Sequence, residues 1–430
     1  MLGIFNIKKY SVLFLTAFLI CILTTVTLTA GAAYSENTSS PDFDVNTSNL
    51  KQMTQEIVSN GPRITVYSEL SSEEENEKGR MATEQSVEYI KNTMESYGLE
   101  TSLEEIREEP FSINNIIGVK RGTNLDDQII IVCSHYDTAR TSPGADDAAL
   151  GVAATLETAR LLQDYELNRT VYFMAFPEHS QPLGADRWIE MHPDLKKNVT
   201  GLIGLDQIGY GDRARIVYIP QTSWLSDLVL HSANALNISV DTYRGPLAVS
   251  DYRPFMEVNV PAIELIESEI TPFHHKPGDT VETINFSLAE DVTRITVKSV
   301  YHLATPEDVE LPLVELASPK NNIISGTTIL PLTYNVSEND THVQVFLDGQ
   351  NLGEISSGEW LIFSPGQHNI KVWATDECGN RGEATASFEV VDYLEFLESK
   401  SDTDFKMYVL GFFAILLIAL IVVLQSKRNK

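Results

Sequence analysis

The chain has 430 residues, of which 43% are hydrophobic, and its formal net charge is −29 at pH 7. This length suffices for two or more folded domains. The strong excess of acidic groups argues against nucleic-acid binding, which needs a positively charged face. The three cysteines, Cys21, Cys133 and Cys378, form no pattern typical of a disulfide framework, so they do not decide the compartment.

The N-terminal segment, residues 1–33, is predicted to direct the chain to a membrane. Lys8 and Lys9 precede a long apolar run that ends near the small residues 30–32, which resemble a cleavage site. The run is longer than the apolar core of most signal peptides. A cleaved signal peptide and an uncleaved signal anchor therefore both stay open. Polar residues 34–49 are predicted to be a loose linker.

Residues 50–305 alternate between helical and strand patterns. After an amphipathic helix at residues 82–97, residues 128–133 form a β-branched apolar run, which is typical of a central strand in a parallel sheet. A helix over about residues 147–165 follows it. Further strands are expected at 170–176, 201–209 and 261–266, and a last helix at 287–304. The pattern predicts an α/β fold with a mostly parallel central sheet flanked by helices.

Histidine and carboxylate side chains follow the ends of these strands. Catalytic groups of open α/β sheets lie beyond the carboxyl ends of the strands, so these side chains are expected to meet at one edge. Histidine and carboxylate are ligands for zinc, and their number fits a hydrolytic pair of zinc ions. The candidates, in chain order, are His135, Asp137, Asp146, Asp147, Glu178, His179, Asp206, His274 and His275.

The order and spacing of these groups resemble the di-zinc exopeptidases. That family includes bacterial secreted leucyl aminopeptidases, glutamate carboxypeptidase-type enzymes and, on the same fold, glutaminyl cyclases. The resemblance covers about residues 46–304, and it also includes residues 250–255, which are similar to a segment that lines the substrate pocket. It implies a zinc-dependent peptidase with two Zn²⁺ ions per chain.

The resemblance implies a role for each matching residue. His135 and Asp206 would bind the first metal, Asp147 would bridge both metals, and His275 would bind the second. Glu178 would be the general base. Asp137 would orient His135 through a hydrogen bond, as carboxylates do for histidine ligands.

Two choices between neighbouring residues rest on the family's spacing. Asp147 is preferred to Asp146 because the bridging aspartate of the family lies four residues before a helix glycine, here Gly151. His275 is preferred to His274 because the family's histidine ligand lies four residues before an Asp-Thr pair, here at 279–280.

The chain departs from the family pattern at His179. The family usually has Glu-Glu where this chain has Glu178-His179, and the second Glu is a metal ligand. Histidine is a competent zinc ligand, so we expect His179 to bind the second metal. In the alternative interpretation His179 points away and the second site is weak or absent.

Residues 312–392 change to short strands with turns between them. The strands are expected near residues 327–334, 343–347 and 368–373, and Asp348-Gly349 is a hairpin signal. This region resembles the immunoglobulin-like β-sandwich modules of secreted microbial enzymes. Within it, Trp373 is expected in the core and His368 in a strand, without a metal-binding role.

The C-terminal segment predicts a membrane anchor. An acidic stalk at residues 393–406 precedes an uninterrupted apolar run, and a transmembrane helix is expected at residues 407–425. The basic tail, residues 426–430, would be cytoplasmic. The chain is thus expected to be a single-pass cell-membrane protein with its catalytic domain outside. Eight Asn-x-Ser/Thr sequons between the two apolar segments are compatible with a glycoprotein.

The leading functional prediction is a membrane-anchored extracytoplasmic zinc metallo-exopeptidase that acts as an aminopeptidase on peptides. A glutaminyl-peptide cyclotransferase on the same fold is an alternative enzyme. A non-catalytic peptidase-like receptor ectodomain is an alternative without chemistry, although a receptor has no need to keep both the ligands and Glu178. The sequence does not indicate the preferred residue of the substrate or the oligomeric state.

Overall fold

The structure is a computed structural model that describes residues 41–66, 68–107, 112–177, 182–246, 250–321, 324–325 and 327–391. Both apolar terminal segments and the stalk lie outside these ranges, as do Glu178 and His179. Within the described ranges, no helix is long and apolar enough to cross a bilayer. The transmembrane helix predicted at 407–425 lies outside the described ranges.

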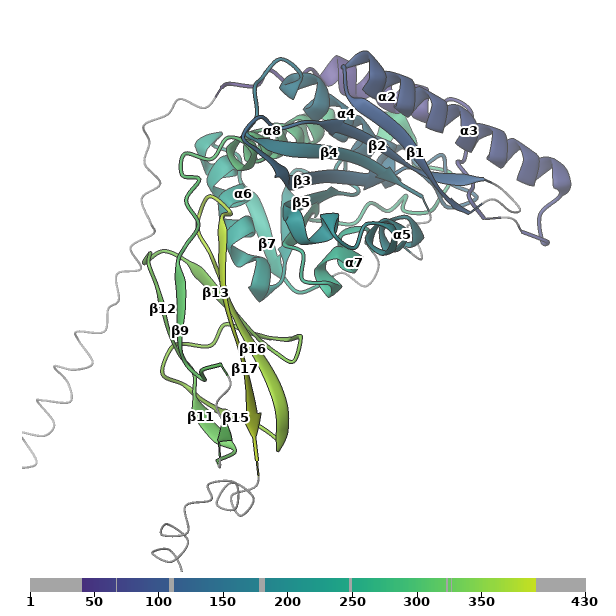
Figure 1. Ribbon diagram of the computed structural model, residues 1–430. Helices are drawn as coiled ribbons and strands as arrows, with labels where there is room; N and C mark the ends of the chain where they lie inside the picture. The colour runs from purple at the N-terminus through teal and green to yellow at the C-terminus, as the bar shows by residue number, and fades with distance from the viewer. Residues whose placement is uncertain are drawn as a thin grey trace, which may run out of the picture. The chain divides into compact units, whose positions relative to one another are not determined.

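The α/β part of the chain contains an eight-stranded sheet and the helices around it (Figure 1). Its strands are β1 (Glu100–Arg107), β2 (Ile113–Lys120), β3 (Leu125–His135), β4 (Arg169–Phe176), β5 (Val199–Leu205), β6 (Ala214–Tyr218), β7 (Val240–Arg244) and β8 (Ala262–Glu267). Its α-helices are α2 (Thr47–Val58), α3 (Glu73–Ser96), α4 (Leu150–Leu162), α5 (Leu183–Met191), α6 (Ser223–Ala235), α7 (Tyr252–Glu257) and α8 (Phe286–Ala304). Short helical turns are η1 (Ala145–Ala149), η2 (Leu195–Asn198), η3 (Pro220–Thr222) and η4 (Val281–Thr283).

The sheet has a parallel centre and antiparallel flanks. Its strand order is β1-β2-β4-β3-β5-β8-β6-β7. The pairs β4–β3, β3–β5 and β5–β8 are parallel, so four consecutive strands point the same way. The pairs β1–β2, β2–β4 and β6–β8 are antiparallel. The sheet is therefore mixed, and the prediction of a mostly parallel sheet holds for the strands that carry the candidate site.

Alternate side chains of β3 enter two separate cores. Ile130 and Val132 pack with α2, α4 and α8 on one face, and Ile129, Ile131 and Cys133 pack with α5 and α7 on the other. Both faces of a central parallel strand are covered in this way, which explains why its sequence is continuously apolar. The result is a helix–sheet–helix arrangement in which the helices cover the two faces of the sheet and not the ends of its strands.

Two predicted boundaries differ from the structure near the N-terminus of the α/β part. From residue 41 onward the predicted linker is folded, since Phe43 and Val45 are buried and Asn46 caps α2 by accepting a hydrogen bond from the Ser48 amide. The helix expected at 82–97 begins earlier, at Glu73. A reciprocal pair of hydrogen bonds between Ser72 and Glu75 fixes this start.

The C-terminal part is all-β, as the short strands and turn signals predicted. Its strands are β9 (Val314–Ser318), β10 (Ile324–Ser325), β11 (Ile329–Pro331), β12 (Thr333–Val336), β13 (His342–Leu347), β14 (Gln350–Gly353), β15 (Trp360–Ile362), β16 (Gly366–Thr375) and β17 (Arg381–Val390). A five-stranded sheet, β10-β17-β16-β13-β14, packs with the pairs β11–β15 and β12–β9 around one core. Its likeness to an immunoglobulin-like module stays a prediction.

Details of this part follow local chemistry. The β13–β14 hairpin turns at Asp348 and Gly349, which have φ angles of 52° and 85°, as the Asp-Gly signal predicts. The single strand expected at 327–334 is instead divided into β11 and β12, which pair with different partners. Pro331 lies at the division, and a proline lacks the N–H that a continuing ladder needs. His368 lies in β16 and contacts Asp348 and the Ser364 carbonyl, which accounts for its burial.

The buried Arg169 links the α/β part to the all-β part. Its guanidinium donates to the Leu303 carbonyl at 2.6 Å, to the Cys378 carbonyl at 2.7 Å and to Asn380 Oδ1 at 2.7 Å. Cys378 and Asn380 belong to the turn between β16 and β17. Burial lowers the pKa of Arg169 to about 10, so the side chain stays charged at neutral pH.

Candidate metal centre

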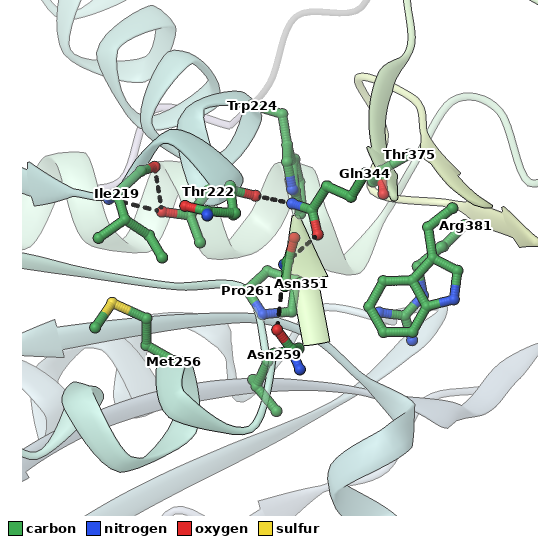
Figure 2. Close-up of a pocket in the computed structure, with 13 residues that line it drawn as sticks. Ile219, Thr222, Trp224, Met256, Asn259, Pro261, Gln344, Asn351, Thr375 and Arg381 are labelled. Carbon is green, nitrogen blue, oxygen red and sulfur yellow. Dashed lines mark hydrogen bonds between the residues drawn. The ribbon is translucent and has the colours of Figure 1, made fainter. Parts of the chain in front are cut away.

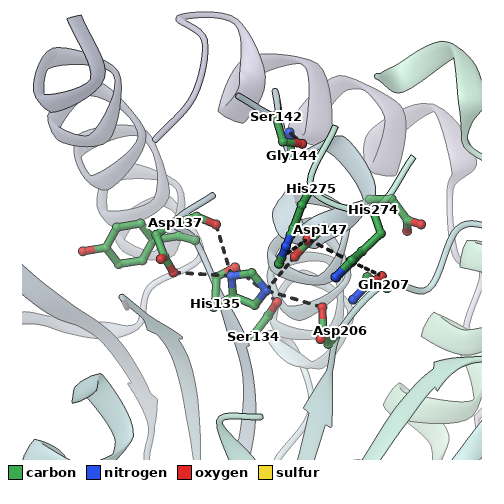
Figure 3. Close-up of polar contacts among 12 residues, drawn as sticks. Ser134, His135, Asp137, Ser142, Gly144, Asp147, Asp206, Gln207, His274 and His275 are labelled. Atoms are coloured by element: carbon green, nitrogen blue, oxygen red, sulfur yellow. Dashed lines mark hydrogen bonds and ion pairs between the residues drawn. The ribbon is translucent and has the colours of Figure 1, made fainter. Parts of the chain in front are cut away.

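His135, the last residue of β3, lies among three carboxylates (Figure 3). Its Nε2 is 3.2 Å from Asp147 Oδ1 and 3.4 Å from Asp206 Oδ1. Its Nδ1 faces Asp137, at 3.4 Å from Oδ1 and 3.1 Å from the backbone oxygen. Burial by itself lowers the pKa of this imidazole, but the surrounding carboxylates raise it well above its ordinary value. This excess of negative charge around one buried nitrogen is what a bound cation would neutralise.

Asp147 belongs to two groups of donor atoms that could each hold a metal ion. The first group is His135, Asp147 and Asp206, all buried, and the second is Asp147, His274 and His275. Within each group the donor atoms lie within 4.8 Å of one another. The two carboxylate oxygens of Asp147 face different groups, so this side chain has the position of a bridge between two metals.

The second group comes from the loop that follows β8. His274 Nδ1 is 3.4 Å and His275 Nε2 is 3.3 Å from Asp147 Oδ2. The two rings stack, and Figure 3 shows both pointing toward Asp147. His274 Nδ1 is also 3.0 Å from Gln207 Oε1. The geometry thus brings both histidines to the site, and the choice of His275 over His274 still rests on the resemblance.

Asp279 explains the local backbone at Asp147. Its carboxylate accepts hydrogen bonds from the Asp146 amide at 2.8 Å and the Asp147 amide at 3.3 Å. Asp147 itself has non-helical φ and ψ angles of −107° and 80°. The helix expected to start at Asp147 therefore starts at Leu150 as α4. A carboxylate from a distant loop replaces helical hydrogen bonds there and holds Asp147 at the strand ends.

Arg63 stabilises the loop between β3 and η1. Its guanidinium donates to three backbone carbonyls, those of Tyr136 at 2.5 Å, Pro143 at 2.8 Å and Gly144 at 2.8 Å. The side chain is fully buried, and burial lowers its pKa to about 10 while Asp137, Asp279 and Asp147 act to raise it. Arg63 therefore supplies a fixed positive charge behind the acidic site and shapes the loop that carries Asp137.

Asp146 lies near Glu267, whereas the next residue, Asp147, belongs to the two donor groups. Burial raises the pKa of both Asp146 and Glu267, and the nearby Asp146 carboxyl group raises that of Glu267 further. Glu267 also accepts from the Tyr210 and Thr271 amides, at 2.9 and 2.6 Å, and so ties together the loops after β5 and β8. Asp146 is in neither donor group, which agrees with the preference for Asp147.

The predicted site residues that the structure describes lie together at one edge of the sheet, as the strand pattern predicts. His135 ends β3, Asp206 directly follows β5, and the loop after β8 carries His275. These are neighbouring parallel strands, and their carboxyl ends share one edge. Glu178 and His179 follow β4, which is also one of the four central strands, but both residues lie outside the described ranges. Their roles stay predictions.

Several residues around the site were not assigned a role from the sequence. In the sequence, Asp279 marks the spacing from His275, and its fixed place in that motif is the one signal for its structural role. Glu267, Gln207 and Arg63 carry no local signal, because their contacts depend on loops that meet only in the folded chain. Residues 250–255, which resemble a segment that lines the substrate pocket in the family, include Tyr252 and Phe255 of α7. Both side chains are fully buried in the core between α7 and the sheet.

A separate cavity of about 150 Å³ lies away from this centre (Figure 2). None of the described residues that line it is an aspartate, glutamate, histidine or cysteine. Its amide groups bond to one another: Gln344 donates to the Gln221 carbonyl, and Asn351 donates to Asn259 Oδ1 at 3.2 Å. The metal-ligand groups are therefore the stronger candidate for chemistry.

The α/β part is similar to known peptidases. Residues 115–300 match Peptidase family M28. Aminopeptidase YwaD of Bacillus subtilis (strain 168) is 28% identical over an alignment of 209 residues that covers 45% of this chain and 45% of that protein. A probable zinc metalloprotease of Pyrenophora tritici-repentis is 31% identical over 109 residues, 23% of this chain and 25% of that protein. The chain therefore matches less than half of the length of these two relatives.

A solved structure supports the same fold. BSAP, a zinc aminopeptidase from Bacillus subtilis, superposes with a TM-score of 0.55 at 14% identity, covering 63% of this chain and 98% of that one. At this identity the likeness establishes the fold alone. Together with the family match and the order of His135, Asp147 and Asp206 at the strand ends, it supports the predicted resemblance to the di-zinc exopeptidases: residues 115–300 match Peptidase family M28, and the α/β part has the fold of this zinc aminopeptidase.

Proposed function

We propose that the protein is a membrane-anchored zinc exopeptidase, an aminopeptidase that removes N-terminal residues from peptides outside the cell. The observation that carries the chemistry is the bridging position of Asp147 between two donor groups. A carboxylate shared in this way fits a pair of zinc ions. When bound, such ions polarise a carbonyl oxygen and activate water for hydrolysis.

The chain's own residues have distinct tasks in this proposal. His135 and Asp206 would hold the first metal together with Asp147, and Asp137 keeps the His135 ring oriented through Nδ1. His275 and His179 would complete the second site. Glu178 accepts a proton from the attacking water and returns it to the leaving amine.

Anchoring and location are supported by the sequence alone. The apolar run within residues 407–425 is long enough to span a bilayer, and the basic residues Lys427, Arg428 and Lys430 favour a cytoplasmic C-terminus. The peptidase would then face outward. A chain cut before Met407 should be released into the medium as an active protein. Active protein that stays in the cytoplasm would contradict the outward location, and protein that stays membrane-bound would favour an uncleaved N-terminal anchor.

A substrate panel with metal analysis tests the activity. The purified protein should cleave free amino-acid anilides, should not cleave their N-acetylated forms, and should contain zinc. Asp206→Asn should lower both zinc content and turnover, whereas Asp212→Asn, an exposed position a few residues away, should change neither. Cyclisation of a glutaminyl peptide without anilide cleavage would favour the cyclotransferase. Zinc-containing protein with no turnover on any substrate would favour the receptor.

A further inference from the structure

One face of the β11–β15 pair is apolar and exposed. In this antiparallel ladder Ile329 pairs with Ile362, and Pro331 pairs with Trp360. Residues two apart on a strand, and residues directly opposite, share a face. The four side chains therefore form one continuous surface, which we call the apolar tip. Trp360 is 67% exposed, Ile362 77% and Ile329 46%.

The opposite face of the same pair is in the core. Leu330 and Leu361 pack against the hydrophobic cluster of the all-β part. The strands thus alternate between core and solvent as expected, but the solvent side carries tryptophan and isoleucine where polar residues are the rule. An exposed apolar surface of this kind marks a site of interaction with another apolar surface.

The apolar tip lies at the end of the all-β part from which the chain continues to its C-terminus. Val390, the last residue of β17, pairs with Gly366, which comes four residues after Ile362. The Phe363 amide donates to the Thr328 carbonyl at 2.7 Å, which holds β15 against the start of β11. Figure 1 shows β11 and β15 beside the end of β17.

Sixteen residues, 391–406, separate this end from the apolar run that begins at Met407. Even fully extended they reach no more than about 55 Å. A bilayer entered at Met407 would therefore lie within reach of the apolar tip. A weak contact becomes populated in this situation because the tether supplies a high effective concentration.

We propose that the apolar tip inserts into the outer interface of the lipid bilayer and so provides a second membrane contact of the all-β part. Tryptophan is favoured at the boundary between lipid headgroups and acyl chains, with its ring in the apolar layer and its N–H near water. The inference rests on the membrane anchor proposed above. It adds a specific surface and a specific depth to that proposal.

The area and charge of the surface favour lipid over a second copy of the chain. Three exposed side chains cannot bury the ~800 Å² per partner that a stable protein interface needs. The tip carries no cation, and its neighbour Glu359 is exposed. Attraction to anionic lipid is therefore not expected, and the contact should form on zwitterionic phosphatidylcholine.

Tryptophan fluorescence tests the proposal in the full chain. The protein is reconstituted in phosphatidylcholine vesicles, with and without bromine atoms near the top of the acyl chains, and flotation reports membrane association. Trp188 and Trp224 are buried, and Trp373, which is half-buried, donates its N–H to Glu383 on β17. The contribution of Trp360 is obtained as the difference between the parent and Trp360→Phe.

Brominated lipid should reduce the fluorescence contributed by Trp360 about twofold or more. The fluorescence contributed by Trp373, obtained in the same way from Trp373→Phe, should change little. Ile362→Ser should weaken this quenching, whereas Leu352→Ser, an exposed apolar position on β14, should not. Protein that floats with the vesicles but shows no quenching of Trp360 overturns the insertion and leaves the anchor intact. Protein that does not float overturns both. Loss of quenching together with cross-linking between copies through residue 360 would assign the tip to self-association.

Discussion

The rings of His274 and His275 stack with centroids 3.8 Å apart, and a nitrogen of each lies within 3.4 Å of the same carboxylate oxygen of Asp147. Either histidine could therefore donate to a second metal ion held by Asp147. His274 also contacts Gln207, which can hold it beside the metal as a hydrogen-bonding neighbour.

We expect His275→Ala to remove about one zinc ion per chain and His274→Ala to leave the zinc content near that of the parent. The reason is that His274 Nδ1, although 3.4 Å from Asp147 Oδ2, is closer to Gln207 Oε1 at 3.0 Å, whereas His275 Nε2 lies 3.3 Å from Asp147 Oδ2. Metal analysis of the dialysed proteins measures the difference. The reverse pattern would assign the ligand to His274, and equal loss in both would make both histidines ligands.

Glu178→Gln should abolish turnover and leave the zinc content nearly unchanged. Glutamine has the shape of glutamate but cannot accept a proton, and a general base contributes about 10²–10⁴ in rate. Steady-state cleavage of an amino-acid anilide, together with metal analysis, measures both effects. A parent-like rate would remove Glu178 from the mechanism, and loss of zinc would make it a ligand.

His179 should make the second metal site sensitive to acid. Histidine binds metal only in its neutral form, and its ordinary pKa of ~6.5 lies above the ~4.3 of the glutamate that the family usually has there. Zinc loss should therefore begin at higher pH in the parent than in His179→Glu, and His179→Ala should lack one zinc ion. Zinc stoichiometry against pH for the three proteins measures this. Full zinc binding by His179→Ala over the whole pH range would show that His179 is not a ligand.

Arg63→Met should destabilise the loop that carries Asp137. The substitution leaves three buried carbonyls without their donor and removes the cation behind three carboxylates, at a cost of about 3–5 kcal/mol. Urea unfolding in the presence of a chelator measures the change in stability without the metal. Arg140→Met is the matched control, because Arg140 lies on the same loop but is partly exposed and should cost much less. Equal effects of both substitutions would contradict a special role for Arg63.

His302 should cause part of any loss of stability in acid. Burial, with the nearby charges of Lys298 and His231, lowers its pKa from 6.5 to about 4. Below pH 6.5 the unfolded chain binds a proton that the folded chain does not, so stability falls between pH 6.5 and 4 and is fully present above pH 6.5. The contribution is about 3 kcal/mol at most. Urea midpoints against pH should therefore fall less steeply for His302→Met, and identical slopes would refute this role.

The sequence predicted which side chains would meet where each of them ends or follows a strand. His135, Asp206 and the loop of His275 each follow a strand whose apolar run is visible in the sequence, and the parallel order of these strands brings them together. The start of α4 could not be predicted in the same way. It depends on Asp279, which lies 132 residues after Asp147 in the chain and supplies the acceptor that interrupts the helix.

Other differences also come from tertiary contacts. The antiparallel flanks of the sheet follow from which strands meet, and an apolar run alone does not encode direction. The position of Arg63 depends on carbonyls of a loop 73–81 residues away. Pro331 is a local signal for the division between β11 and β12. No local signal indicates that the two strands pair with different partners.

The hydrogen bonds of Arg169 set a limit on protein engineering. A gene shortened to the α/β part would leave the Leu303 carbonyl as an acceptor but would remove Cys378 and Asn380, and the arginine would then lie at a newly exposed surface. Exchange of the all-β part for an unrelated module would have the same effect unless the new module offered matching acceptors. A soluble form for crystallisation or drug screening should therefore keep the chain through residue 391, and Arg169→Gln is the first compensating change to try if a shorter form is required.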